Sequence, residues 1–286
     1  MKPKATSIYL NSLKTSFLTL AIAVSSTVWA SATTAATLKV TIENIGPEEG
    51  VFFSRTWVGF HDGNFDIFND GETAPELLER LAEDAITEPT GAFQNTLSST
   101  FLDNGTVGTE GTILGLTGSF SDFFPGDRVS STFKIDDPTA SRYFSYAAMI
   151  LPSNDAFFGN ENPFAVEIFD EEGNFLGADF IITGAQIGDA GTEVNDEVPE
   201  NTAALAQAAP NTGINENGVV SPHPGFIPGG NILTAFPNAD FTQPNYQLAR
   251  IKIEKVPEPA TGIGLLALGS LFLLKKKRSS VKNRQF

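Results

Sequence analysis

Three acidic residues of the sequence lie on two short polar loops, each next to a hydrophobic run. Asp155 lies in residues 151–159, LPSNDAFFG, and Asp189 and Glu193 lie in residues 188–195, GDAGTEVN. Asp189 and Glu193 are four residues apart across a loop that contains glycine, so both carboxylates can face one ion. Asp155 can join them if the intervening strands fold back. The alternative is that all three are solvated turn residues of an acidic protein.

This pattern predicts a site for a hard cation, and we expect the cofactor to be Ca²⁺. Calcium takes about 6 to 8 oxygen ligands at about 2.3 to 2.6 Å, from carboxylates, amide and backbone carbonyls and water. Small residues in both loops let backbone carbonyls turn inward. Magnesium and manganese also bind oxygen ligands, so the choice among the three ions stays open.

The segments around these carboxylates resemble the spondin domain, which occurs in animal matrix proteins and in many bacterial secreted proteins. The resemblance covers roughly residues 38–255. Four motifs carry it in the right order: VGFHDGNFDIF (58–68), LAED (81–84), PSNDAF (152–157) with DAGTE (189–193), and VVSPHPGF (219–226).

The resemblance implies a β-sandwich with the topology of calcium-dependent phospholipid-binding modules and one calcium ion held by loops at one end. Carried over by position, the metal ligands would be Asp155, Asp189 and Glu193, with Glu193 standing where animal members carry Asp. Glutamate is one methylene longer and can still bind. The backbone carbonyl of Thr192 is a further expected ligand.

Both ends of the sequence resemble targeting segments. Basic residues precede an apolar run at 17–24, and small residues lead up to Ala30. This pattern predicts a secretory signal peptide, residues 1–30, with cleavage after Ala30 or, as second choice, after Ala36. A transmembrane anchor is disfavoured there because the apolar run is short.

At the other end, the letters PEP at 257–259 precede an apolar run at 260–274 and four basic residues at 275–278. This arrangement resembles the PEP-CTERM sorting signal, which implies processing by a membrane protease of the exosortase type. As a helix, the run would rise only about 22 Å, short of a hydrocarbon core of about 30 Å. We therefore expect residues 256–280 to be a sorting signal whose short transmembrane segment anchors the protein transiently in the inner membrane.

One domain, residues 37–255, remains between these signals, and its composition limits its partners. Outside the terminal segments, nine Lys and Arg stand against 33 Asp and Glu, a net charge of about −24. Nucleic acids and anionic membrane surfaces require basic patches, so neither is an expected partner. The sequence has no cysteine, which excludes disulfides and thiol chemistry.

Hydrophobic periodicity predicts an all-β fold, an antiparallel β-sandwich with one short helix and long loops. The helix is expected at 73–85, opened by a capping box from Thr73, and a hairpin is expected around 170–174. Residues 195–218 are expected to be a long loop that could cover the metal site, and residues 231–245 to be irregular. Five segments read as strands: 37–45, 52–60, 129–135, 143–151 and 248–256.

No enzyme motif is present, because the only histidines are His61 and His223 and neither G-x-S-x-G nor H-E-x-x-H occurs. We expect a non-enzymatic, calcium-binding module of the cell envelope or extracellular surface, acting in adhesion or matrix assembly. Its partner would be a surface or matrix protein or a glycan. The alternatives are a glycan or exopolysaccharide module that stacks sugars on Phe157 and Phe158, and an envelope hydrolase that uses carboxylates.

Overall fold

The structure is a computed structural model that describes residues 35–103 and 106–257. The expected signal peptide, residues 1–30, lies outside the described residues. So does the expected sorting segment, 256–280, apart from its first two residues. Within the described ranges, no helix combines the length and hydrophobicity that a bilayer crossing requires.

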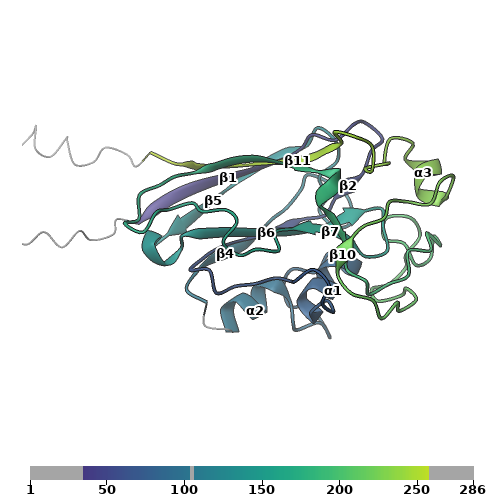
Figure 1. Ribbon diagram of the computed structural model, residues 1–286, viewed down its shortest axis with the longest axis horizontal. Helices are drawn as coiled ribbons and strands as arrows, with labels where there is room; N and C mark the ends of the chain where they lie inside the picture. Colours follow the sequence, from purple (N-terminus) through teal and green to yellow (C-terminus); the bar gives the residue numbers. More distant parts are fainter. Residues whose placement is uncertain (1–34, 104–105, 258–286) are drawn as a thin grey trace, which may run out of the picture. The chain divides into compact units, whose positions relative to one another are not determined.

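Two antiparallel sheets pack face to face, which confirms the predicted all-β sandwich (Figure 1). The first sheet has the order β5-β1-β11-β8, and the second has the order β10-β9-β7-β6-β3-β4 with β2 beside β6. The first sheet contains β1 (Ala36–Asn44), β5 (Arg128–Ile135), β8 (Ala178–Thr183) and β11 (Gln247–Lys255). The second contains β2 (Phe52–Phe53), β3 (Thr56–His61), β4 (Gly108–Ile113), β6 (Tyr143–Leu151), β7 (Ala156–Gly159), β9 (Ile187–Asp189) and β10 (Ser221–Pro222).

Strand β1 shows why the alternating pattern forms a sheet with one buried and one solvent-exposed face. Leu38, Val40 and Ile42 are fully buried between the sheets, and Lys39 and Glu43 point outward. The strand pairs with β5 on one side and β11 on the other, so strands from distant parts of the chain share one register. Strand β6 is instead buried on both faces, because helix α1 covers its outer side.

Helix α1 (Glu76–Asp84) confirms the predicted helix and its apolar stripe. Its buried residues include Leu77, Leu78 and Leu81. The predicted cap at Thr73 is wrong, because Pro75 is the N-cap and no side chain caps the helix. Helices α1 and α2 (Leu97–Asp103) pack on the outer face of the second sheet (Figure 1).

The chain contains more helix than expected in two places. Helix α3 (Asn231–Ala235) lies in a stretch that we expected to be irregular. Helix α2 lies in residues 87–128, whose Gly, Thr, Ser and Asp content instead indicates loops and short strands. Two 3-10 helices, η1 (Pro138–Ala140) and η2 (Gly184–Gln186), connect strands. The turn expected at 170–174 forms, since Asp170 accepts the backbone N–H of Asn174. An antiparallel bridge between Phe169 and Phe175 confirms the hairpin next to the turn. Farther along the chain, β8 pairs with β11.

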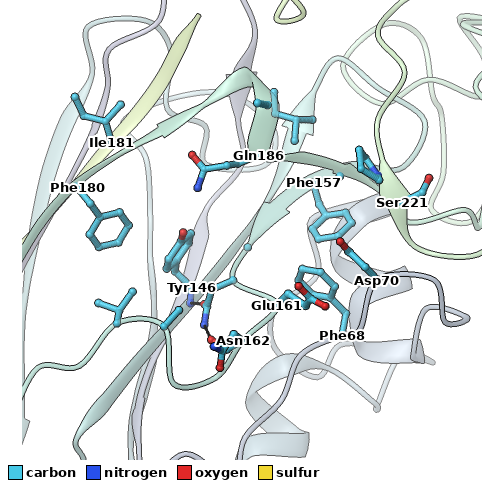
Figure 2. A pocket seen from close by; sticks show the side chains of 18 residues that line it. Phe68, Asp70, Tyr146, Phe157, Glu161, Asn162, Phe180, Ile181, Gln186 and Ser221 are labelled. Atoms are coloured by element: carbon cyan, nitrogen blue, oxygen red, sulfur yellow. Dashed lines mark hydrogen bonds between the residues drawn. The ribbon is translucent and has the colours of Figure 1, made fainter. Parts of the chain in front are cut away.

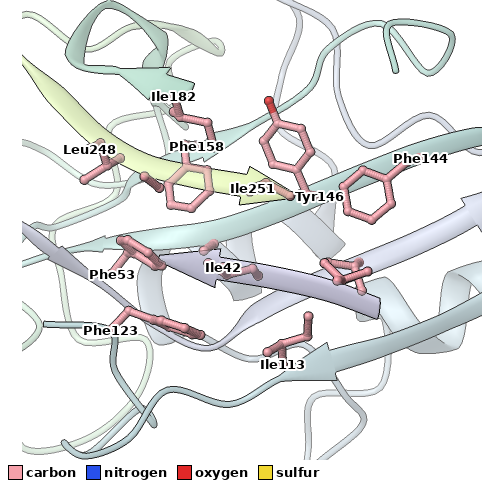
Figure 3. Close-up of a cluster of buried hydrophobic side chains, with 14 of the residues drawn as sticks. Ile42, Phe53, Ile113, Phe123, Phe144, Tyr146, Phe158, Ile182, Leu248 and Ile251 are labelled. Atoms are coloured by element: carbon pink, nitrogen blue, oxygen red, sulfur yellow. The ribbon is translucent and has the colours of Figure 1, made fainter. Parts of the chain in front are cut away.

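Phe157 and Phe158 on β7 point to opposite faces of their sheet, as neighbours in a strand do. The Phe157 ring packs edge-on against Phe68, 5.0 Å between centroids, on the side of α1 (Figure 2). Phe158 points into the space between the sheets and meets Phe53 (Figure 3). Their exposed fractions are 1% and 0%. The prediction that these two rings stack on sugars at the surface is therefore wrong, because both rings are part of the core.

Candidate functional site

The pairing of β7 with β9 brings two of the predicted site residues together. Ala156 lies opposite Asp189 in this antiparallel pair, so Asp155, just before β7, lies beside the end of β9. The backbone N–H of Ala190 donates to the carbonyl of Asp155 at 3.2 Å. The intervening strands do fold back, which is the condition that the sequence placed on joining Asp155 to Asp189.

The Asp155 carboxylate holds the loop that follows β9. Its Oδ2 accepts three hydrogen bonds, from the backbone N–H of Thr192 (2.8 Å), the Thr192 hydroxyl (3.2 Å) and the backbone N–H of Glu193 (3.0 Å). Its Oδ1 is buried and has no hydrogen-bond partner among the residues that the structure describes. One half of this fully buried carboxylate is thus structural, while the other half is free to bind a ligand.

Glu193 shows the same division between its two oxygens. Its Oε1 accepts the backbone N–H of Gly213 at 2.8 Å, whereas its Oε2 is buried and has no partner within residues 35–103 and 106–257. Residues 214–218 run alongside 191–194, with three backbone hydrogen bonds between the two segments. A Cβ at position 213 would overlap the Glu193 carboxyl group, so a larger residue there would have to displace this carboxyl group. The loop of residues 195–218 therefore folds back over Glu193.

Asp189 differs from the other two carboxylates because both of its oxygens have partners. Oδ1 accepts the backbone N–H of Gly191 at 2.8 Å, and Oδ2 accepts the side-chain amide of Asn195 at 2.6 Å. The Asn195 oxygen lies 3.2 Å from His223 Nε2, and His223 Nδ1 accepts the backbone N–H of Gly225. His223 must therefore carry its proton on Nε2 and donate it to Asn195. This chain of hydrogen bonds orients Asp189 toward the loop.

Three charged residues at the end of α1 join the site, and the sequence analysis did not place them there. Arg80 lies 2.9 Å from Glu83 and 3.1 Å from Asp84, and all three side chains are buried. The backbone N–H of Asn211 donates to Asp84 at 3.1 Å, which ties this helix end to the loop over Glu193. The i,i+3 and i,i+4 spacing in RLAED predicts these ion pairs, but only the fold brings them near Glu193.

Buried carboxylates outnumber buried bases here, and the pKa values reflect this imbalance. Burial, followed by the charge of Asp189, raises the pKa of Asp155 to about 7. Burial, followed by the charge of Glu83, raises the pKa of Glu193 to about 8. Burial also raises the pKa of Glu83 to about 7, although Arg80 opposes it. Without a further cation, these carboxyls hold protons near neutral pH.

The donor set suits a hard cation, but it is not a closed cage of side chains. In the part of the chain that the structure describes, no three Asp, Glu or His side chains are arranged to hold a metal ion. The available side-chain donors are Asp155 Oδ1 and Glu193 Oε2, and Asp189 could add an oxygen only by releasing Asn195. Calcium accepts backbone carbonyls and water as its remaining ligands, so the two free oxygens are compatible with it.

The comparisons with known proteins concern the end of the chain. Residues 255–278 match the PEP-CTERM protein-sorting motif, which confirms the predicted sorting signal. No curated protein matches the chain significantly, and no match supports the spondin resemblance. Because this motif directs exported proteins to the exosortase system, the protein is a cell-envelope or extracellular surface protein.

Proposed function

We propose that this protein is a non-enzymatic, calcium-binding surface module for adhesion or extracellular matrix assembly. One observation carries the calcium site: in the described part of the chain, two buried carboxylate oxygens, Asp155 Oδ1 and Glu193 Oε2, lack a partner, and the cluster has a single arginine, Arg80. A buried charge without a partner is costly, so a divalent cation is the ligand that this arrangement favours. The spondin resemblance supports the same ion at the same residues.

Calcium, when bound, supplies two positive charges beside carboxyl groups that otherwise hold protons. The contacts of these carboxyl groups determine which segments the ion would hold in place. Asp155 already anchors residues 192 and 193, Glu193 holds Gly213, and Asp84 holds Asn211. A cation bound to Asp155 and Glu193 would therefore stiffen β7, the loop after β9 and the covering loop together. The surface that these loops present is the region we propose for partner recognition.

An envelope hydrolase is less consistent with this geometry. Asp155 is fully buried, and one of its oxygens is occupied by three donors. The two histidines are also buried, and burial lowers the pKa of each to about 4. The buried carboxylates of Asp155 and Glu193 therefore lack the access to a bulky substrate that acid–base catalysis requires.

The test is isothermal titration of calcium into the EDTA-treated protein, with Asp155→Asn and Glu193→Gln as variants. Glu172→Gln is the matched control, since Glu172 is an exposed carboxylate on the turn at 170–174. We expect about one ion per chain in the wild type and the control, and at least a tenfold weaker affinity in each site variant, about 1.4 kcal/mol. A magnesium titration of the same samples determines ion preference.

Thermal unfolding provides a second readout. A ligand that binds only the folded state at about 100 times its Kd stabilises it by about 2.7 kcal/mol. Calcium should therefore raise the Tm of the wild type and of Glu172→Gln but not of Asp155→Asn. If calcium gives neither heat nor a Tm shift in the wild type, the site is a buried proton-binding cluster and the calcium mechanism is wrong.

The adhesion role needs a test on cells. The protein applied to cells that produce the matrix should be retained with calcium and released by EDTA, and Asp155→Asn should be retained no better than the wild type in EDTA. If EDTA releases neither protein from the cells, the partner binds a surface that does not depend on the calcium site.

A further inference from the structure

The hollow that Figure 2 shows is a second candidate site, separate from the carboxylate cluster. It has a volume of about 460 Å³ and lies where β8 and η2 meet β7, β9 and β10. This volume falls within the range of about 300 to 1,000 Å³ for small-molecule sites. Four aromatic residues line it: Phe68, Tyr146, Phe157 and Phe180.

Tyr146 gives the hollow a polar group at a fixed position. The residue is 4% exposed and lines the hollow. Its hydroxyl is not one of the buried, unpartnered side-chain atoms of the described residues, so it faces the open space of the hollow. The ring is held 5.4 Å from Phe180, and the backbone N–H of Tyr146 donates to Asn160 at 2.9 Å. A ligand hydroxyl in the hollow can therefore form a hydrogen bond with the Tyr146 hydroxyl.

The remaining polar groups of the hollow are carboxylates and amides. Asp70 and Glu161 are exposed on its rim, on the same side as Phe68 in Figure 2. Across the hollow, Gln186 Oε1 is occupied by Thr183, which leaves the Gln186 amide N–H groups to donate. Carboxylate oxygens accept hydrogen bonds from neighbouring hydroxyls, and amides can donate to ring oxygens.

Charge excludes a large class of ligands. None of the described residues that line the hollow is Lys or Arg, and two are acidic. A phosphate, a sulfate or a uronic acid would be repelled, because such anions need basic partners or helix N-termini. An uncharged molecule with many hydroxyls and apolar C–H faces fits both the aromatic rings and the acceptors.

We propose that this hollow binds an uncharged saccharide. The half-exposed Phe180 ring would lie against the C–H face of the sugar, and the Tyr146 hydroxyl, Glu161 and Asp70 would bind its hydroxyls. The site uses none of the residues of the carboxylate cluster, so this inference stands whether or not calcium binds.

The test is ligand-observed NMR and isothermal titration with the purified full chain in EDTA, which makes the result independent of calcium. The probes are glucose, galactose, mannose, N-acetylglucosamine, cellobiose and lactose, with glucuronic acid as the anionic comparison. We expect at least one neutral probe to bind and glucuronic acid to bind at least about tenfold more weakly than that probe.

Two variants test the residues. Glu161→Gln, an exposed change that leaves the fold intact, should weaken binding of that probe about tenfold, because a hydrogen bond to a charged group is lost. Phe180→Ala should weaken it by a similar factor, whereas Phe164→Ala, a 54% exposed ring outside the hollow, should leave it unchanged. The proposal is overturned if no neutral probe binds at about 10 mM, if both site variants bind like the wild type, or if glucuronic acid binds as tightly as the neutral probe.

Discussion

Two regions of the molecule hold carboxylates in opposite ways. On the outer face of the first sheet, Arg250 forms two 2.7 Å hydrogen bonds with Asp179, and Lys39 and Lys252 both contact Glu254. The exposed fractions of these side chains lie between 38% and 48%. Among the described residues at the end of the sandwich, one buried arginine, Arg80, accompanies five buried carboxylates: Glu83, Asp84, Asp155, Asp189 and Glu193. Basic residues of the domain thus form ion pairs on the exposed face of the first sheet, where water screens their charge.

The pKa directions follow this contrast. Hydrogen bonds from Arg250 lower the pKa of Asp179, and those from Lys252 and Lys39 lower that of Glu254. Burial raises the pKa of Asp155 and Glu193. Surface ion pairs add little stability, so the first sheet does not depend on these exposed pairs for its stability. The buried cluster is instead unstable in its charged form unless it binds protons or a cation.

The largest expected effect comes from removing the single base of the cluster. Arg80→Ala leaves Glu83 and Asp84 buried without their partner and should destabilise the fold by about 3 to 5 kcal/mol. Urea unfolding measures this loss. Arg250→Ala on the sheet is the matched control and should leave the midpoint unchanged. Equal losses would mean that burial does not distinguish the two regions.

A somewhat smaller loss is expected for Asp155→Ala. Two backbone N–H groups and one hydroxyl lose their acceptor, which should cost about 2 to 3 kcal/mol. Asp179→Ala is the control, with no measurable change expected. Urea unfolding of both variants in EDTA provides the comparison, and a loss in Asp179→Ala as large as that in Asp155→Ala would contradict it.

The pH dependence of stability should separate the regions further. A carboxyl group whose pKa is raised in the folded state binds more protons in the folded than in the unfolded state. The free energy of unfolding therefore falls as the pH rises from the unfolded-state pKa to the folded-state pKa. For Asp155 and Glu193, this window runs from about 4 to about 7 and about 8. In EDTA we expect the free energy of unfolding to fall across this window, measured by urea unfolding at a series of pH values.

Saturating calcium should remove most of this fall, because the ion favours the charged carboxylates. Glu193→Gln should also flatten the curve in EDTA, whereas Glu254→Gln on the sheet should not. If the Glu193→Gln curve falls as steeply as the wild-type curve in EDTA, the buried cluster as described is wrong.

The smallest expected effect is that of salt on the sheet. Raising ionic strength screens exposed pairs such as Arg250–Asp179 and leaves buried ones nearly untouched. The Tm of the wild type in EDTA should therefore change little between low and moderate salt. A large decrease would show that the surface pairs, and not the core, stabilise the first sheet.

The sequence by itself determined the local features of this protein. Alternation of Leu38, Val40 and Ile42 predicted β1, the apolar stripe predicted α1, and the letters around PEP at 257–259 predicted the sorting motif that the comparison confirms. Each of these depends on neighbours within about one or two turns of chain, so the residue pattern is sufficient.

Only the tertiary structure decided what the carboxylates meet. Asp155 lies beside Asp189 because β7 pairs with β9, and Glu83 lies near Glu193 because α1 packs on β6 and β7. Phe157 is buried, and the hollow beside Tyr146 is lined by residues of β6, β7, β8, β9 and β10. Burial and unmatched charge are properties of elements that meet from distant parts of the chain, and spacing along the sequence does not encode which elements those are.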